Sequence, residues 1–209
     1  MVGKALVTIV AGATNSRSVK SVRSVSNNFE YVDNQFKAVW IANKDGLHNA
    51  YELSEDKVFS PVWNQKLDIL YVCVGPSSHA KERVDIVAIM GASRVNHTRS
   101  IKSLTDRHNN AFPSSNPDGD KLVYRSTGKD GYKNLYIMDN AKEGSLGAEG
   151  VEPRSLTEGK WTDTHCQWSP NGEWIVFSST RDKPDSGAPE SDQGLDPGYF
   201  AVYLVKMFW

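Results

Sequence analysis

Residues 163 to 166 bring together side chains that serve in nucleophilic catalysis: Asp163, Thr164, His165 and Cys166. A cysteine nucleophile needs a histidine within hydrogen-bond reach and a carboxylate that orients the histidine. His165 and Cys166 are adjacent, and adjacent residues of a strand point to opposite faces of the sheet. We therefore expect no proton transfer between them and predict no catalytic residue in this chain.

Serine chemistry is equally unsupported. The sequence contains no Gly-x-Ser-x-Gly segment, which forms the strand-to-helix elbow of a serine hydrolase. Ser115 and Ser169 precede turns at equivalent places of an internal repeat, which favours a structural role. We predict that the chain is not an enzyme.

Metal or cofactor binding has little basis in the sequence. The five histidines are scattered without His-x-His spacing, and Cys73 and Cys166 are too far apart for a CxxC motif. We expect two buried thiols, with a disulfide left open as the alternative. Residues 182–196 contain four aspartates, which do not follow the EF-hand order. A weak calcium site there is left open. We predict no metal and no cofactor.

Composition excludes two classes of partner. The formal net charge is −1, from 24 basic and 25 acidic residues, so no electrostatic attraction to nucleic acid is expected. No apolar run approaches the roughly 20 residues of a membrane span. Residues 1–13 resemble a leader peptide only weakly, because their apolar stretch is short. The compartment stays open, with the cytoplasm favoured over secretion.

The elements that position these residues belong to an internal repeat, the strongest signal in the chain. Residues 115–126 (SNPDGDKLVYRS) align without a gap to residues 168–179 (WSPNGEWIVFSS), a period of 168 − 115 = 53. Leu104-Thr105-Asp106 and Leu156-Thr157-Glu158 precede them at a spacing of 52. A weaker copy covers residues 53–72, and a partial fourth one ends near residues 36–46.

Each repeat combines a tight turn with short strands. In Pro-Asp-Gly and Pro-Asn-Gly, proline fixes φ, the Asx side chain bonds the local backbone, and glycine supplies a positive φ. A β-branched and aromatic strand follows, then a polar turn and another strand. One repeat therefore predicts about four antiparallel strands, the size of one propeller blade.

These boundaries divide the chain into four parts. Residues 1–50 are predicted as an N-terminal region with part of a blade, and residues 51–103 as a degenerate blade. Residues 104–157 and 158–209 are predicted as two regular blades, the last with a long loop insertion at 181–198. Trp63, Trp168 and Trp174 are predicted to pack between blades, because large aromatic side chains fill the space between sheets.

The repeat resembles that of TolB-type, WD40-like β-propellers. The segments that carry the resemblance are residues 110–126, 134–139, 154–159 and, most closely, Trp168-Ser-Pro-Asn-Gly172. The sequence of the repeat is similar to that of plant TolB-related proteins and to the propeller portion of dipeptidyl-peptidase-type enzymes. The resemblance implies an all-β fold, here a partial β-propeller of about three to four four-stranded antiparallel blades.

The resemblance also implies where a ligand would bind. It places Asp163, Thr164 and His165 just before the first strand of a blade, towards the central channel, with Asn109 and Asn110 at the matching place of the previous blade. We predict these five as ligand-binding residues; the alternative is that they bond the backbone of their own blade.

The function implied is a non-catalytic scaffold that binds a protein or peptide. The alternative is the propeller fragment of a peptidase-type hydrolase whose catalytic domain lies outside this chain. The resemblance implies a ring of six or more blades, so three or four suggest a partial chain. Open blade edges are prone to self-association, and we expect a homo-oligomer as a further partner.

Overall fold

The computed structural model describes residues 29–33, 35–43, 46–53, 55–76, 82–94, 99–139, 152–182 and 200–208. The regular elements within these ranges are all strands, paired antiparallel in four sheets. The first sheet contains β1 (Phe29–Val32), β2 (Ala38–Asn43) and β3 (Gly46–Glu52). The second contains β4 (Lys57–Trp63), β5 (Ile69–Gly75), β6 (Asp85–Met90) and β7 (Ser100–Ser103).

The third sheet contains β8 (Ala111–Ser115), β9 (Leu122–Ser126), β10 (Asn134–Met138) and β11 (Arg154–Ser155). The fourth contains β12 (Asp163–Trp168), β13 (Trp174–Ser179) and β14 (Ala201–Lys206). The prediction of an all-β partial propeller is confirmed, with two sheets of four strands and two of three among the described residues. Residues 1–13 and 183–198, on which the leader and most of the predicted loop fall, lie outside the described residues.

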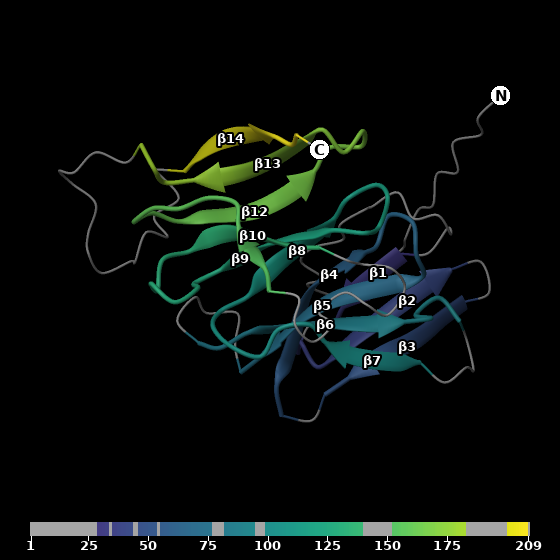
Figure 1. Cartoon of the computed structure of the whole chain (residues 1–209). Helices are drawn as coiled ribbons and strands as arrows, with labels where there is room; N and C mark the ends of the chain where they lie inside the picture. The colour runs from purple at the N-terminus through teal and green to yellow at the C-terminus, as the bar shows by residue number, and fades with distance from the viewer. Residues whose placement is uncertain are drawn as a thin grey trace.

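The sheets follow one another in chain order, from the purple first sheet to the yellow-green last one (Figure 1). The first strands of successive sheets, β1, β4, β8 and β12, are neighbours in space. The core lies between the sheets. Tyr71 and Tyr124, 53 residues apart in the chain, meet in the cluster between the second and third sheets. Burying each such side chain contributes about 1.5–3 kcal/mol.

The repeated turns have the expected backbone. Gly119 and Gly172 have φ of 72° and 74°, and residues with a Cβ rarely adopt this region. The degraded copy lacks the glycine and uses a side chain in its place. There Asn64 Oδ1 accepts hydrogen bonds from the backbone N–H groups of Lys66 (2.9 Å) and Leu67 (2.8 Å). Asn64 Nδ2 also donates to the carbonyl of Gly119 (3.1 Å), which ties the second sheet to the third.

The repeated Leu-Thr element joins one sheet to the next. Thr105 Oγ1 accepts a hydrogen bond from the backbone of Ile86 (2.9 Å), and Thr157 Oγ1 accepts one from Leu135 (3.0 Å). In both copies the preceding leucine packs against the core between sheets. The repeat therefore satisfies the backbone where each chain segment leaves its sheet.

The tryptophans divide into two groups. Trp63 and Trp168 are buried between sheets, as predicted. The prediction for Trp174 is wrong: it is 36% exposed on the outer face of the last sheet, with Lys206 Nζ 5.6 Å from its ring centroid. No neighbouring sheet among the described residues covers this face, and Val202, Leu204 and Phe208 are exposed there as well.

Candidate binding site

The first strands of the second, third and fourth sheets, β4, β8 and β12, are the inner strands of their sheets and share one irregularity. The pairing register shifts between Phe59 and Val62, between Ala111 and Ser114, and between Thr164 and Gln167. Each bulge contains one non-glycine residue at positive φ: Ser60 (48°), Phe112 (56°) and His165 (53°). Their spacings, 112 − 60 = 52 and 165 − 112 = 53, reproduce the repeat. A bulge changes the direction of its side chain, so each inner strand presents one residue out of the normal alternation.

The two predicted asparagines bond the surrounding backbone. Asn109 Nδ2 donates to the carbonyl of Glu82 (2.5 Å), and its Oδ1 accepts from Arg125 Nη2. Asn110 Nδ2 donates to the carbonyls of Val84 (3.2 Å) and Arg107. Both side chains are buried. These bonds connect the second-sheet segment at Glu82 and Val84 with the start of the third sheet.

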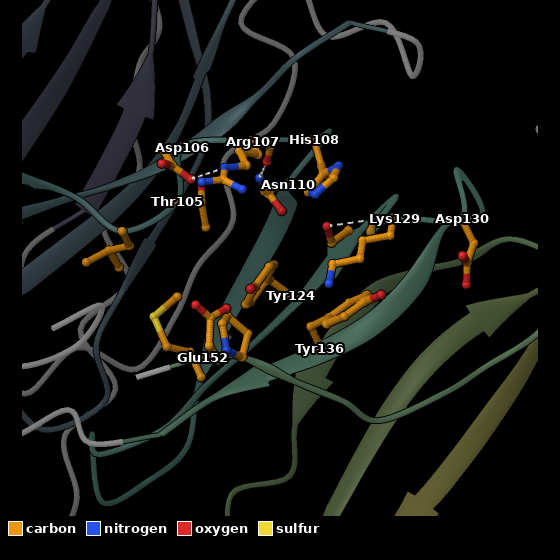
Figure 2. Close-up of a pocket in the computed structure, with 15 residues that line it drawn as sticks. Thr105, Asp106, Arg107, His108, Asn110, Tyr124, Lys129, Asp130, Tyr136 and Glu152 are labelled. Atoms are coloured by element: carbon orange, nitrogen blue, oxygen red, sulfur yellow. Dashed lines mark hydrogen bonds and ion pairs between the residues drawn. The ribbon is translucent and has the colours of Figure 1, made fainter. Parts of the chain in front are cut away.

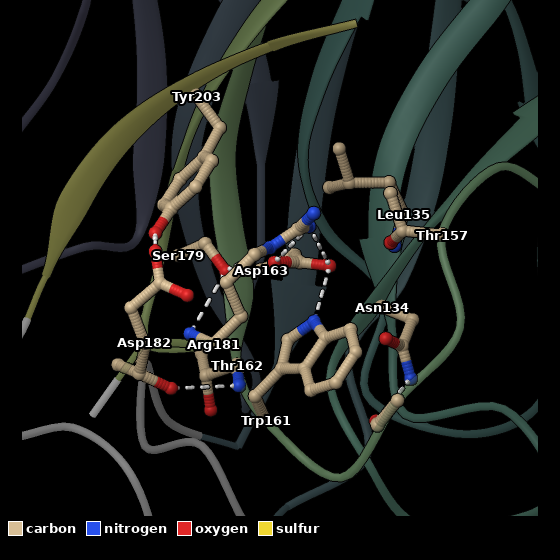
Figure 3. Close-up of polar contacts among 12 residues, drawn as sticks. Asn134, Leu135, Thr157, Trp161, Thr162, Asp163, Ser179, Arg181, Asp182 and Tyr203 are labelled. Atoms are coloured by element: carbon tan, nitrogen blue, oxygen red, sulfur yellow. Dashed lines mark hydrogen bonds and ion pairs between the residues drawn. The ribbon is translucent and has the colours of Figure 1, made fainter. Parts of the chain in front are cut away.

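Asp163 is the centre of a polar cluster at the start of β12 (Figure 3). Its carboxylate is fully buried and accepts from Arg181 Nη2 (3.1 and 3.3 Å) and from Trp161 Nε1 (3.0 Å). The Arg181 guanidinium lies over the rings of Trp161, Phe177 and Tyr203, at 5.2, 5.1 and 4.7 Å from their centroids. The Asp163 carboxylate is therefore bonded to Arg181 and does not orient His165.

The remaining predicted residues lie on different sides of β12. His165 is exposed and stacks on Phe112, with ring centroids 4.1 Å apart and 27° between the planes. Cys166 is fully buried, as expected for adjacent strand residues. Thr164 is buried, and its Oγ1 has no hydrogen-bond partner among the described residues. Asp163, Thr164 and His165 lie inside β12, the first strand of the blade. The sequence had predicted them just before this strand.

A cleft of about 770 Å³ lies between the second and third sheets (Figure 2). This volume falls in the usual range for ligand sites, roughly 300–1,000 Å³. Its apolar lining includes Leu104, Tyr124, Tyr136 and Met138. Charged side chains surround these, and the full set on the rim is Asp106, Arg107, Lys129, Asp130 and Glu152. Of the five predicted site residues, Asn110 is the one that lines this cleft.

The two tyrosines form the floor of the cleft. Their ring centroids are 6.3 Å apart, and burial raises the pKa of both phenols, so they remain neutral at physiological pH. Gly128, at φ 51°, leaves room for the Tyr136 hydroxyl, because a Cβ there would collide with Tyr136 Oη. No motif in the sequence marks this floor, because both tyrosines occupy ordinary strand positions.

The described residues of the cleft contain no hydrogen-bonded Ser–His pair. Ser126 Oγ accepts from the backbone N–H of Gly128 (3.1 Å), and the ring of His108 has no hydrogen-bond partner among the described residues. Outside the cleft, Ser115 Oγ accepts from the backbone of Gln65 (2.9 Å), which agrees with its predicted structural role. Cys73 and Cys166 are buried and form no disulfide. Within the described ranges, no group of three or more His, Cys, Asp or Glu side chains could hold a metal ion.

Successive antiparallel sheets with adjacent inner strands define the class of this molecule as a β-propeller. The chain belongs to the family described as the dipeptidyl peptidase IV (DPP IV) N-terminal region, whose sequence profile matches residues 64–207. The predicted resemblance to TolB-like and dipeptidyl-peptidase-type propellers is thereby confirmed.

Solved structures show the same fold. TolB from Acinetobacter baumannii has a TM-score of 0.54 and 21% identity, with 75% of this chain and 37% of that chain covered. A putative TolB from Agrobacterium tumefaciens has a TM-score of 0.59 and 16% identity, covering 87% and 58%. A puromycin hydrolase has a TM-score of 0.51 and 14% identity, covering 74% and 26%. This chain thus spans 58% or less of each of these structures.

No curated protein sequence matches this chain. Among the described residues there is no helix with the length and hydropathy needed to cross a bilayer.

Proposed function

We propose that this chain is a non-catalytic propeller scaffold that binds a peptide segment of a protein partner in the cleft between its second and third sheets. The observation that carries the proposal is the Tyr124–Tyr136 floor inside a charged rim. Aromatic side chains supply large contact area at low cost in conformational entropy, and charged rims add specificity.

The rim favours one kind of peptide. Asp106, Asp130 and Glu152 outnumber Arg107 and Lys129, so the rim carries a formal charge of 2 − 3 = −1. An exposed pair such as Asp106–Arg107, at 3.6 Å, contributes little to stability and leaves both groups available to a partner. The expected ligand is a segment with an apolar or aromatic side chain for the floor and a basic residue beside it.

Peptide selection tests the proposal. Peptides selected from a random library on the wild-type protein should lose at least tenfold in affinity when Tyr136 is replaced by alanine, measured by isothermal titration calorimetry. Tyr132→Ala is the matched control, because Tyr132 is 40% exposed on the same hairpin and does not line the cleft. Equal affinities of the two variants for the selected peptides would contradict the proposal.

The family match favours a second candidate, the propeller portion of a peptidase-type hydrolase. In that case the cleft would serve a catalytic domain outside residues 1–209. Both candidates hold that this chain is not itself an enzyme. A fluorophosphonate probe that labelled this chain stoichiometrically would contradict that shared statement.

We also propose self-association through the last sheet. Trp174, Val202, Leu204 and Phe208 expose an apolar surface on its outer side, at exposures of 36%, 73%, 64% and 82%. Exposed apolar surface of this kind is typical of protein contacts. A second copy of the chain is the partner we expect to cover it.

A further inference from the structure

Two cations are buried at one end of the third sheet. Arg125 is the fourth residue of β9 and is 5% exposed; Lys133 immediately precedes β10 and is 6% exposed. Both lie near β12: the carbonyl of Lys133 accepts a hydrogen bond from the backbone of Asp163 (2.7 Å). Charged side chains are almost never this buried unless they are paired.

Neither cation has a carboxylate partner among the described residues. Arg125 donates to the neutral Asn109 Oδ1 and lies 4.9 Å from the Phe112 centroid, while its buried Nε has no hydrogen-bond partner. The Lys133 ammonium group makes no hydrogen bond or ion pair with any described residue. The nearby Asp163 carboxylate is already bonded to Arg181 and Trp161.

The electrostatic consequence is a local excess of positive charge. Burial is the main factor that lowers the pKa of Arg125 to about 10 and that of Lys133 to about 8, and for Lys133 repulsion by Arg125 adds to it. Both side chains still carry a charge at neutral pH. Two buried like charges without an anion are costly, and the cost falls when an anion binds.

The fold itself does not require these cations. Strand registers pair Leu135 with Arg125, Ile86 with Cys73, and Val202 with Ser178, so Cys73 and Ser178 occupy the Arg125 position in the neighbouring sheets. Lys133 lies two residues before Leu135. The residues two positions before Ile86 and Val202 are Val84 and Phe200, which are therefore the counterparts of Lys133. Uncharged residues therefore serve at both positions in the second and fourth sheets.

We propose that Arg125 and Lys133 together bind an oxyanion of the carboxylate or phosphate class. The unpaired Nε–H of Arg125 and the ammonium group of Lys133 are the donors, and guanidinium and ammonium groups both bind such oxygens. The site is separate from the cleft, since neither cation lines it. Phe112, over which the Arg125 guanidinium lies, stacks on its other neighbour, the exposed ring of His165.

Inorganic phosphate and acetate are the probes, each added to the full chain in sodium chloride at constant ionic strength. We expect phosphate, acetate or both to raise the Tm of the wild-type protein, and the anion that does so identifies the class. The binding constant from calorimetry should weaken at least tenfold in Lys133→Met and in Arg125→Met. Lys160→Met is the control, because Lys160 is an exposed lysine that does not line the cleft, and its response should equal that of the wild type.

A second readout separates binding from a structural role. In chloride alone, Lys133→Met should have a higher Tm than the wild type, because an apolar side chain replaces an unpaired buried charge. Saturating anion should reverse this order. The proposal is overturned if neither anion raises the wild-type Tm, if Lys133→Met responds like the wild type, or if Lys133→Met is already the less stable protein in chloride. Should Arg125→Met fail to fold, Lys133→Met alone decides.

Discussion

The contact between Arg181 and Asp163 provides the sharpest test of how the last sheet is held together. Arg181 follows β13 and Asp163 begins β12, and the guanidinium donates to both carboxylate oxygens. Replacing Arg181 by methionine keeps the length of the side chain and removes its charge. The fully buried Asp163 carboxylate is then left with Trp161 as its side-chain donor among the described residues.

The structure sets the size of the effect. Breaking a buried ion pair by removing one partner costs about 3–5 kcal/mol. The Arg181 side chain is 27% exposed, so water replaces part of the lost interaction, and we expect about 2–3 kcal/mol. Asp163→Asn should cost about 2 kcal/mol, because hydrogen bonds to a charged group are lost. The double variant should be more stable than the sum of the two single effects predicts by about 1–2 kcal/mol.

Urea unfolding followed by tryptophan fluorescence measures all four proteins. Arg154→Met is the control, because Arg154 and Asp139 form an exposed pair at 3.3 Å, with side chains 47% and 38% exposed. That variant should lie within about 0.5 kcal/mol of the wild type. The reasoning is refuted if Arg181→Met is as stable as Arg154→Met, or if the two single effects simply add.

Three further predictions concern the turns, the buried lysine and the exposed face. Gly119→Ala should lower the free energy of unfolding by about 2–3 kcal/mol, because αL backbone costs a residue with a Cβ about 1–2 kcal/mol and the new Cβ also meets Asn64 Oδ1 and lies 3.1 Å from Lys66 Cβ. Gly172→Ala should cost about 1 kcal/mol in the same urea titration, because its Cβ comes no closer than 3.4 Å to another residue. Equal losses in the two variants would contradict this account. Burial lowers the pKa of Lys133 from 10.5 to about 8, so between these pH values the unfolded chain binds more protons than the folded one and stability should rise with pH; Lys133→Met should remove that part of the slope in thermal unfolding from pH 7 to 10, and an unchanged slope would argue against an unpaired lysine. Leu204→Lys should lower the weight-average mass in sedimentation equilibrium if the last sheet mediates self-association, and a wild-type protein that sediments as a monomer would rule out that contact.

Local sequence determined the repeated elements of this protein. Pro-Asp-Gly and Pro-Asn-Gly impose their turns through backbone sterics that act within four residues, and Gly119 and Gly172 have the positive φ that these turns require. The 53-residue period likewise predicted successive blades, because one blade cannot bury both of its faces alone. His165 is exposed and Cys166 is fully buried, as the alternation of strand residues predicted, although the bulge between Thr164 and Gln167 also affects the direction of the His165 side chain.

The tertiary structure decided which polar groups meet. Asp163 pairs with Arg181, 18 residues away. Only the pairing of β12 with β13 brings these two side chains together, so the spacing of residues 163–166 could not show that Asp163 would bond Arg181 and not His165. The cleft arises because the β7–β8 connection lies opposite Tyr124 and Tyr136, although neither segment carries a motif. Trp174 was misassigned for the same reason: a strand pattern shows that a side chain faces outward, whereas its burial depends on whether another sheet lies against it.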